Sequence, residues 1–250
     1  MNQIIALIQA RTSSSRLPGK VLLPLEGKPM ILRQIERVVR SRRVHSLQLV
    51  TSTSPDDDEL AGVCEAAGVK AYRGSLDDVL DRFYQAVLPS RPAHVVRITG
   101  DCPLFDHRVL DALINFHLEG GFDYSSNALQ PTWPDGLDAE VMKFSALEIA
   151  WKNAKLKSDR EHVTPFIYRN KEQFRLGDFR NDEDLSGMRW TVDEPEDFEL
   201  VKKIYGALIS QNSDFGTSDI LKLLGQHPEW TKLNSGISRN EGYQRSLARD

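Results

Sequence analysis

Apolar and polar stretches alternate along the first half of the chain in a pattern that predicts strands and helices in regular succession. The apolar run IIALIQ at 4–9 is typical of a strand that is covered on both faces. From Pro29 onward, apolar residues recur at helical spacing, which predicts an amphipathic helix. The succession then repeats, with strands expected at 47–51, 69–73 and 94–99 and helices expected at 54–68, 75–88 and 106–118.

This repetition of strand and helix predicts the fold class. It favours an α/β protein with a doubly wound, mainly parallel sheet of the Rossmann type, with helices on both faces and right-handed crossovers. The pattern changes after Gly121. There, strands are expected in FDYSSN, AEVMKF and RWTV, at 122–127, 139–144 and 189–192, and helices are expected near 144–154 and 158–170.

No linker, repeat or low-complexity segment divides the chain, so we expect one catalytic domain over residues 1–225. Residues 226–250 form a polar tail whose apolar positions lose their periodicity. Two interpretations of this tail stay open. It is either a mobile terminus or a dimerisation arm that lies on a second copy of the chain.

The composition excludes several classes of protein. The formal net charge of -4 gives no overall attraction to nucleic acid or to an anionic membrane. The 2 cysteines, Cys64 and Cys102, are too few for a disulfide framework and lack the spacing of a zinc site. No segment approaches the roughly 18 consecutive apolar residues of a membrane span. We therefore expect a cytoplasmic protein that binds neither nucleic acid nor membranes.

One short segment concentrates positive charge directly after the first predicted strand. In ARTSSSRLPGK, serines separate Arg11 from Arg16, and the turn residues Pro18 and Gly19 lead to Lys20. Ligands of open α/β sheets bind at the carboxyl ends of the strands, where such a loop directs backbone N–H groups and cations at an anion. The segment matches neither the P-loop nor GxGxxG. We favour a polyphosphate site of another kind over surface ion pairs.

Two aspartates follow two further predicted strands. Asp101 follows the strand 94–99 in RITGDCP, and Asp193 follows the predicted strand RWTV. A divalent cation usually accompanies a polyphosphate substrate, and carboxylates held on separate strands are ligands that Mg²⁺ accepts. We expect both aspartates to bind Mg²⁺. The alternative is that each of them caps a helix.

Two more groups of polar residues are candidates for substrate contacts. Ser75, Asp77 and Asp78 lie at another strand end and are candidates for contacts with a base or ribose. The second group is Asp138 and Glu140 in PDGLDAEV, together with Arg160 and His162 in SDREHVTPF. These side chains suit contacts with sugar hydroxyls or a substrate carboxylate, and they equally suit salt bridges and helix caps. Both interpretations of this second group stay open, as does a role of His162 as general base.

Several of these segments together resemble a known enzyme family. IQARTSSSRLPGKVLLPLEGKPMILRQIER is similar to the N-terminal signature of the cytidylyltransferases that make CMP-activated sugar acids. RITGDCPL resembles their strand-Gly-Asp metal motif, and WTVDEPEDFEL resembles a metal-binding stretch of the 3-deoxy-manno-octulosonate enzymes. RGSLDDVLDRF, PDGLDAEV, DREHVTPF and RNEGYQRSL are similar to the spore-coat polysaccharide F-like branch. The resemblance therefore spans most of the chain.

The resemblance implies a nucleotidyltransferase of GT-A-like fold, usually a homodimer, that transfers CMP from CTP to a sugar acid in surface polysaccharide synthesis. It implies catalysis by Arg11, Lys20 and Asp101 and binding of Mg²⁺ by Asp101 and Asp193. Taken with the positions above, the expected nucleotide-binding residues are Ala10, Arg11, Arg16, Lys20, Ser75, Asp78 and Thr99, and the expected sugar-binding residues are Asp138, Glu140, Arg160 and His162.

One departure from the family pattern affects specificity. Where the octulosonate enzymes have Gln-Gly-Asp-Glu-Pro, this chain has TGDCP at 99–103 and lacks their base-contacting glutamine. The choice of CTP over UTP therefore stays open, and so does the acceptor. The alternative functions are a CDP-forming enzyme that acts on a sugar or alditol phosphate, a GT-A glycosyltransferase, and a silent nucleotide-binding subunit.

Overall fold

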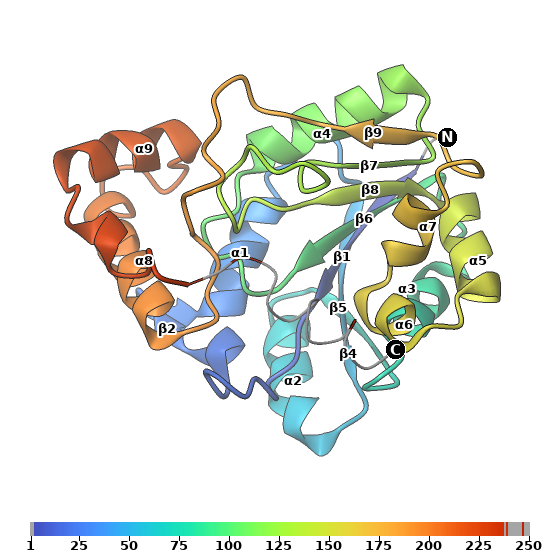
Figure 1. Ribbon diagram of the computed structural model, residues 1–250. Helices are drawn as coiled ribbons and strands as arrows, with labels where there is room; N and C mark the ends of the chain where they lie inside the picture. The colour runs from blue at the N-terminus through green and yellow to red at the C-terminus, as the bar shows by residue number, and fades with distance from the viewer. Residues whose placement is uncertain (1–2, 238, 240–246, 248–250) are drawn as a thin grey trace.

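The computed structural model shown in Figure 1 describes residues 3–237, 239 and 247. Its main sheet has seven strands in the order β5-β4-β1-β6-β8-β7-β9. These strands are β1 (Ile4–Gln9), β4 (Ser46–Ser52), β5 (Lys70–Gly74), β6 (His94–Thr99), β7 (Tyr124–Ser126), β8 (Glu140–Lys143) and β9 (Leu176–Asp178). A short hairpin of β2 (Pro24–Leu25) and β3 (Lys28–Pro29) forms a second sheet.

The pairing directions confirm the predicted doubly wound, mainly parallel sheet. β1 is parallel to β4 and β6, β4 is parallel to β5, and β7 is parallel to β9. In the described part of the sheet only β8 runs the other way, and it pairs antiparallel with β6 and β7. The carboxyl ends of the parallel strands therefore meet at one edge, where a ligand can reach several of them.

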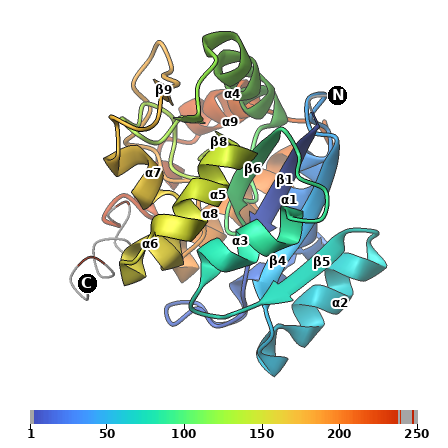
Figure 2. The same ribbon diagram turned by 90° about the vertical axis from the view of Figure 1, so that its right-hand side faces the viewer.

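Helices cover both faces of the sheet, as Figure 2 shows. On one face lie α1 (Met30–Val38), α2 (Asp58–Ala66) and α4 (His107–Gly120), and on the other lie α3 (Val79–Val87), α5 (Phe144–Asn153) and α7 (Pro165–Arg169). β1 contributes to both cores because its side chains alternate: Ile4 and Ile8 pack on the first face, and Ile5 and Leu7 pack on the second. None of the helices in the described residues has the combination of length and apolarity that a bilayer crossing requires.

A third core lies at one end of the molecule, where α8 (Pro195–Leu208) and α9 (Thr217–Gln226) pack together (Figure 1). Trp190 and Val192 are buried in this core. Their position explains why the predicted strand RWTV is wrong. The side chains pack against helices, and the backbone of this segment forms a single parallel bridge, between Arg189 and Asp135.

The helix expected near 158–170 is two helices. α6 (Lys157–His162) ends at Val163, whose φ of 73° lies in the left-handed region, and α7 starts at Pro165. Pro165 occupies the first turn of α7, where its fixed φ and missing N–H suit the start of a new helix. The break turns α6 toward α3, so that the end of α6 lies beside the cavities described below.

The first part of the polar tail is joined to the domain. After η3 (Trp230–Lys232), Asn234 is buried, and its side-chain amide donates to Asp197 Oδ1 at 2.8 Å and to the Arg189 carbonyl at 3.0 Å. Residues 238, 240–246 and 248–250 lie outside the described residues. The expected dimerisation arm, residues 226–250, falls partly on them and stays a prediction.

A buried histidine pair predicts loss of stability in acid. His94 Nδ1 lies 3.0 Å from His117 Nε2, and His117 Nδ1 lies 2.9 Å from Ser125 Oγ. Burial lowers the pKa of His117 to about 3, and burial also lowers the pKa of His94. The folded state therefore favours neutral rings, and stability is lost as the pH falls below the unfolded pKa of about 6.5.

Between pH 7 and pH 5, we expect the free energy of unfolding to fall by about 2 kcal/mol more in the wild type than in His117→Gln. The reason is that, at pH 5, the His117 ring stays neutral in the folded wild type but takes up a proton in the unfolded chain. Urea unfolding at the two pH values measures this. His227→Gln is the matched control, since His227 is on the surface, and it should keep the wild-type difference. Equal pH dependence in the wild type and His117→Gln would contradict the interpretation.

Candidate active site

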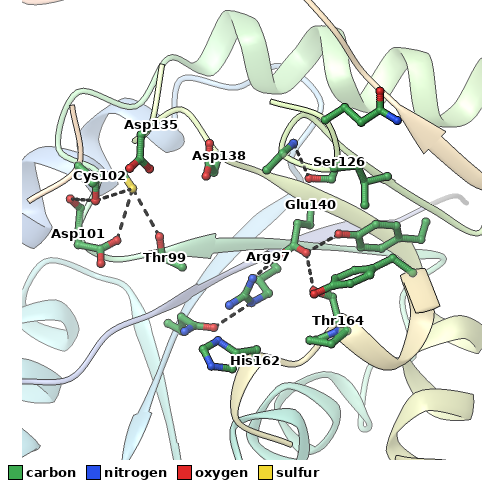
Figure 3. Close-up of a pocket in the computed structure, with 18 of the residues that line it drawn as sticks. Arg97, Thr99, Asp101, Cys102, Ser126, Asp135, Asp138, Glu140, His162 and Thr164 are labelled. Atoms are coloured by element: carbon green, nitrogen blue, oxygen red, sulfur yellow. Dashed lines mark hydrogen bonds and ion pairs between the residues drawn. The ribbon is translucent and has the colours of Figure 1, made fainter. Parts of the chain in front are cut away.

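Two adjoining cavities lie at the carboxyl ends of β1 and β6. The smaller, here called the basic cavity, has a volume of about 310 Å³ and is lined mainly by the loop after β1, with smaller contributions from the end of β6 and from α3. The larger, here called the wide cavity and shown in Figure 3, has a volume of about 820 Å³ and extends along β7 and β8. The residues that line both are Gln9, Arg16, Thr99, Asp101, His162 and Asp193. A ligand can therefore extend from one cavity into the other.

Lys20 lies beside this junction and joins three segments. Its ammonium donates to Asp101 Oδ2 at 3.1 Å, to Asp193 Oδ1 at 2.8 Å and to the Val192 carbonyl at 2.7 Å. Burial lowers the pKa of Lys20, but the two carboxylates outweigh burial and hold this pKa above its ordinary value. Gly19, with a φ of 68°, supplies the left-handed turn that leads into Lys20.

Asp101 is a fixed anion at the end of β6. Burial raises the pKa of its carboxyl group, but Lys20 and the Thr99 and Cys102 side chains lower this pKa to about 2. Figure 3 shows Asp101, Thr99 and Cys102 grouped on one wall of the wide cavity. The preceding Gly100 is needed because a Cβ there would lie 2.7 Å from the Ala10 side chain. The ends of β1 and β6 therefore approach closely.

The loop that bears the predicted cations is attached to η2 (Pro55–Asp57). Asp57 is buried and accepts hydrogen bonds from Thr12 N at 2.8 Å, from Thr12 Oγ1 at 2.9 Å and from Ser52 Oγ at 2.5 Å. Gly19 N donates to the Thr12 carbonyl at 2.9 Å, which closes the loop. The positive charge of Arg11 and Lys20 is thus presented by a preformed loop.

Arg189 fixes the position of Asp193. Its guanidinium binds Asp135 Oδ2, Asp193 Oδ2 and Asp197 Oδ1, each at 2.9 Å. Asp197 is fully buried and also accepts from the backbone N–H of Asp193 and Glu194 at 2.9 and 3.0 Å, as part of the N-terminal cap of α8. The cap of a helix therefore holds a carboxylate at the cavity junction.

The wall of the wide cavity carries further carboxylates. Figure 3 shows Asp135 and Asp138 pointing into the space beside Cys102, with Glu140 farther along. Glu140 pairs with Arg97 and accepts from the Tyr124 and Thr164 hydroxyls at 2.5 Å each. Burial and the neighbouring Asp138 raise the pKa of Asp135 to about 7. These groups suit hydrogen bonds to a polyhydroxylated ligand.

The structure brings most of the predicted site residues together. Ala10, Arg11, Arg16, Lys20, Thr99, Asp101 and Asp193 line the basic cavity, and Asp138, Glu140 and His162 line the wide cavity.

Four predicted residues, Ser75, Asp77, Asp78 and Arg160, line neither cavity. Ser75 Oγ accepts from Asp78 N at 3.1 Å, and Asp78 caps α3 by accepting from Asp81 N at 2.9 Å. Arg160 donates to Asp78 Oδ2 at 3.0 Å through Nε and to the Trp151 carbonyl at 2.8 Å. Ser75, Asp78 and Arg160 thus join α6 to the start of α3. The expected part of these residues and Asp77 in substrate contact stays a prediction.

Arg82 and Val79 line the basic cavity and were missed in the sequence. Both lie on α3, in the turns that follow Asp78. The available signal was their spacing in DDVLDR, which places both on one helix face. An arginine in an amphipathic helix is normally solvated, however, and nothing in the sequence marks this one as buried.

Comparison with known proteins places this geometry in a family. A cytidylyltransferase family model matches residues 5–220. The spore coat polysaccharide biosynthesis protein SpsF of Bacillus subtilis is 33% identical over 236 residues, which is 92% of this chain and 97% of the relative. The resemblance drawn from the motifs is confirmed.

Solved structures agree with this result. A cytidylyltransferase from Leptospira borgpetersenii superimposes with a TM-score of 0.87 at 30% identity, covering 92% of this chain and 97% of that one. A CMP:2-keto-3-deoxy-manno-octonic acid synthetase complexed with CTP has a TM-score of 0.64 at 18% identity, covering 82% of this chain and 99% of that one. The second likeness supports the nucleotidyltransferase fold.

Arg189→Met tests whether this side chain holds the junction together. We expect it to lower the free energy of unfolding by about 3–5 kcal/mol at pH 7, because Asp197 is then buried without its cation. Arg189 helps to hold the pKa of Asp197 below its ordinary value, so the loss should shrink as the pH falls and Asp197 takes up a proton. Urea unfolding at pH 7 and pH 5 measures both effects.

Arg180→Met is the matched control, because Arg180 makes an exposed ion pair with Asp178, and pairs of this kind contribute about 0–1 kcal/mol. A loss in Arg189→Met no larger than in Arg180→Met would show that the buried network is not held by this arginine.

Proposed function

The chain belongs to the cytidylyltransferase family, and from this premise we propose that it transfers CMP from CTP to a hydroxyl group of a sugar acid, of the ulosonic or nonulosonic type, and releases pyrophosphate. Family membership makes the chain a CTP-dependent enzyme. The observation that carries the proposal is the junction at Lys20, Asp101 and Asp193, where a basic cavity suited to a nucleotide opens into a wide cavity suited to an acceptor.

The nucleotide is assigned to the basic cavity. Its loop wall combines Arg11, Arg16 and Lys20 with the serine hydroxyls of residues 13–15, which suits the charge of a triphosphate. The α-phosphorus must lie at the junction, because an acceptor in the wide cavity has to reach it. In-line attack then forms the bond from the acceptor oxygen to phosphorus, breaks the bond to the departing pyrophosphate and releases the hydroxyl proton to solvent.

The charged side chains at the junction account for catalysis in this proposal. Lys20 and Arg11 stabilise the negative charge on the α-phosphate and the departing pyrophosphate, and Arg16 binds the outer phosphates. Lys20 is held in place before the substrate arrives, so it needs little reorganisation during the reaction. The remaining contribution is the alignment of acceptor and phosphorus.

Asp101 and Asp193 fit a divalent cation. Each places a carboxylate oxygen on the same Lys20 ammonium, so both reach one common point, and hard oxygen ligands of this kind suit Mg²⁺. Within residues 3–237, 239 and 247, no group of three or more His, Cys, Asp or Glu side chains is placed to hold a metal, so the other ligands would be phosphate oxygens and water. When bound, Mg²⁺ would neutralise charge on the phosphate oxygens.

The acceptor is assigned to the wide cavity. Asp138 and Glu140 supply acceptors for sugar hydroxyls, and Lys171 supplies positive charge for a carboxylate. The name of the Bacillus subtilis relative supports a role in surface polysaccharide synthesis. The motif resemblance supports a homodimer in the cytoplasm.

Pyrophosphate release tests the reaction. With Mg²⁺, each of the four nucleoside triphosphates is offered with a panel of ulosonic acids, nonulosonic acids, sugar phosphates and alditol phosphates. We expect release with CTP and a sugar acid, and a CMP-sugar as the product by mass spectrometry. Release with a phosphorylated acceptor and a CDP product would replace the sugar-acid proposal with the CDP-forming alternative.

Lys20→Met tests the role of the ammonium. We expect kcat to fall about 10²–10³-fold, as for removal of one preorganised donor to a developing charge, with a smaller change in the KM for the acceptor. Lys28→Met is the control, because Lys28 is exposed and pairs with Glu36 away from both cavities. Steady-state kinetics measures both variants. A kcat for Lys20→Met within a few-fold of that for Lys28→Met would contradict the mechanism.

A further inference from the structure

Arg82 is a buried cation whose charge is poorly matched by its surroundings. The residue is only 3% exposed, and its Nε and Nη1 atoms are buried without a hydrogen-bond partner among the described residues. Burial lowers the pKa of Arg82 to about 10, and the nearby Arg11 lowers it further, while Asp57 and Asp78 act in the opposite direction. Burying charge without hydrogen bonds costs free energy, so a ligand that supplies acceptors is the expected partner.

The fold makes specific room for this side chain. A Cβ on Gly74, the last residue of β5, would lie 2.7 Å from Arg82 Cγ. Gly74 itself has no positive φ, so its backbone does not require glycine. The glycine therefore lets the stem of Arg82 pass the end of β5 and reach the basic cavity, which Arg82 lines.

The position of Arg82 favours contact with the base over contact with the phosphates. The basic cavity has a loop wall, formed by residues 10–21, and a helix wall, formed by Val79, Arg82 and residues 161–162. The loop wall already carries three cations for the phosphates. The helix wall joins the Arg82 guanidinium to the apolar side chain of Val79, a combination that suits the edge and the face of a pyrimidine ring.

We propose that Arg82 reads the base of the nucleotide by donating hydrogen bonds to O2 and N3 of cytosine. This inference rests on the assignment of the nucleotide to the basic cavity. Cytosine presents O2 and N3 as adjacent acceptors, and the planar guanidinium fork matches such a pair. Uracil carries a hydrogen on N3, which would face a donor. Arg82 thus selects CTP over UTP in a chain that lacks the base-contacting glutamine of related enzymes.

Nucleotide binding without acceptor tests this selection. Isothermal titration calorimetry with Mg²⁺ compares CTP, UTP and 3-deaza-CTP, in which a C–H group replaces N3. In the wild type we expect CTP to bind about 10–100-fold more tightly than the other two, as for one bidentate contact to a base. The variants are Arg82→Met and Arg82→Lys, and Arg42→Met is a control that removes one exposed positive charge far from both cavities.

Arg82→Met should bind CTP, UTP and 3-deaza-CTP within about 3-fold of one another, and Arg42→Met should keep the wild-type preference. Arg82→Lys retains the charge but not the fork, so it should also lose the preference. Equal losses for CTP and UTP in Arg82→Met, restored by Arg82→Lys, would mean that Arg82 binds phosphate and would overturn the proposal. Equal affinity of the wild type for CTP and 3-deaza-CTP would overturn it without any variant.

Thermal unfolding without nucleotide separates a binding role from a structural one. Because Arg82→Met removes a buried, poorly matched charge, we expect its Tm to rise by about 2–6 °C. A fall in Tm would show that the guanidinium supports the fold and would count against the proposal. Gly74→Ala, which displaces Arg82 without removing it, should reduce the preference for CTP over UTP.

These measurements need no turnover. If no acceptor in the panel gives pyrophosphate, the proposed reaction fails, while the nucleotide affinities still decide the role of Arg82.

Discussion

The contact of the Lys20 ammonium with Asp101 and Asp193 is the interaction on which the rest of the site depends. It joins positions that are 81 and 173 residues apart in sequence. Two carboxylates that converge on one point repel each other, and Lys20 is the cation that makes their approach favourable. The loop after β1, the end of β6 and the segment before α8 are therefore placed relative to one another by charge as well as by packing. A nucleotide that enters the basic cavity brings phosphate oxygens that compete with these carboxylates for Lys20. The carboxylates of Asp101 and Asp193 then need a new positively charged partner, which a divalent cation supplies.

This arrangement is supported by buried side chains around the junction. Asp57 holds the loop after β1, and Arg189 and Asp197 couple Asp193 to the cap of α8. Each support is a buried carboxylate with several hydrogen bonds, so each is costly to break and geometrically specific. Asp57 belongs to η2, Asp197 lies in the first turn of α8, and Arg189 lies in the segment that precedes this helix. The N-terminal cap of α8 therefore also positions Asp193 at the site.

The sequence predicted the sheet well and the supports poorly, for physical reasons. The strand at 4–9 is buried on both faces, so its apolar run is unambiguous, and the cations after it had to lie at a sheet edge. RWTV shows a similar apolar pattern, but Trp190 and Val192 pack against α8 and α9, and local pattern does not distinguish a sheet from a helix pair as the partner. The break before Pro165 had a local signal that helical periodicity obscured. The burial of Arg82 and Arg189 had no local signal, because an arginine is identified as buried only when distant segments are known to enclose it.

The basic cavity holds two buried cations in opposite electrostatic states. Lys20 has a pKa above its ordinary value because carboxylates already neutralise it, whereas the pKa of Arg82 is lowered because burial is not compensated. A ligand gains little from Lys20 until the existing pairs rearrange. It gains at once from Arg82, whose Nε and Nη1 have no hydrogen-bond partner to lose among the described residues. Binding and chemistry therefore depend on different cations. Arg82 provides affinity by recognising the base, and this affinity offsets the free-energy cost of separating Lys20 from its carboxylates so that it can contact the phosphates. A nucleotide with the wrong base lacks this compensation, so selection of the base and activation of the phosphate are coupled through the charge balance of one cavity.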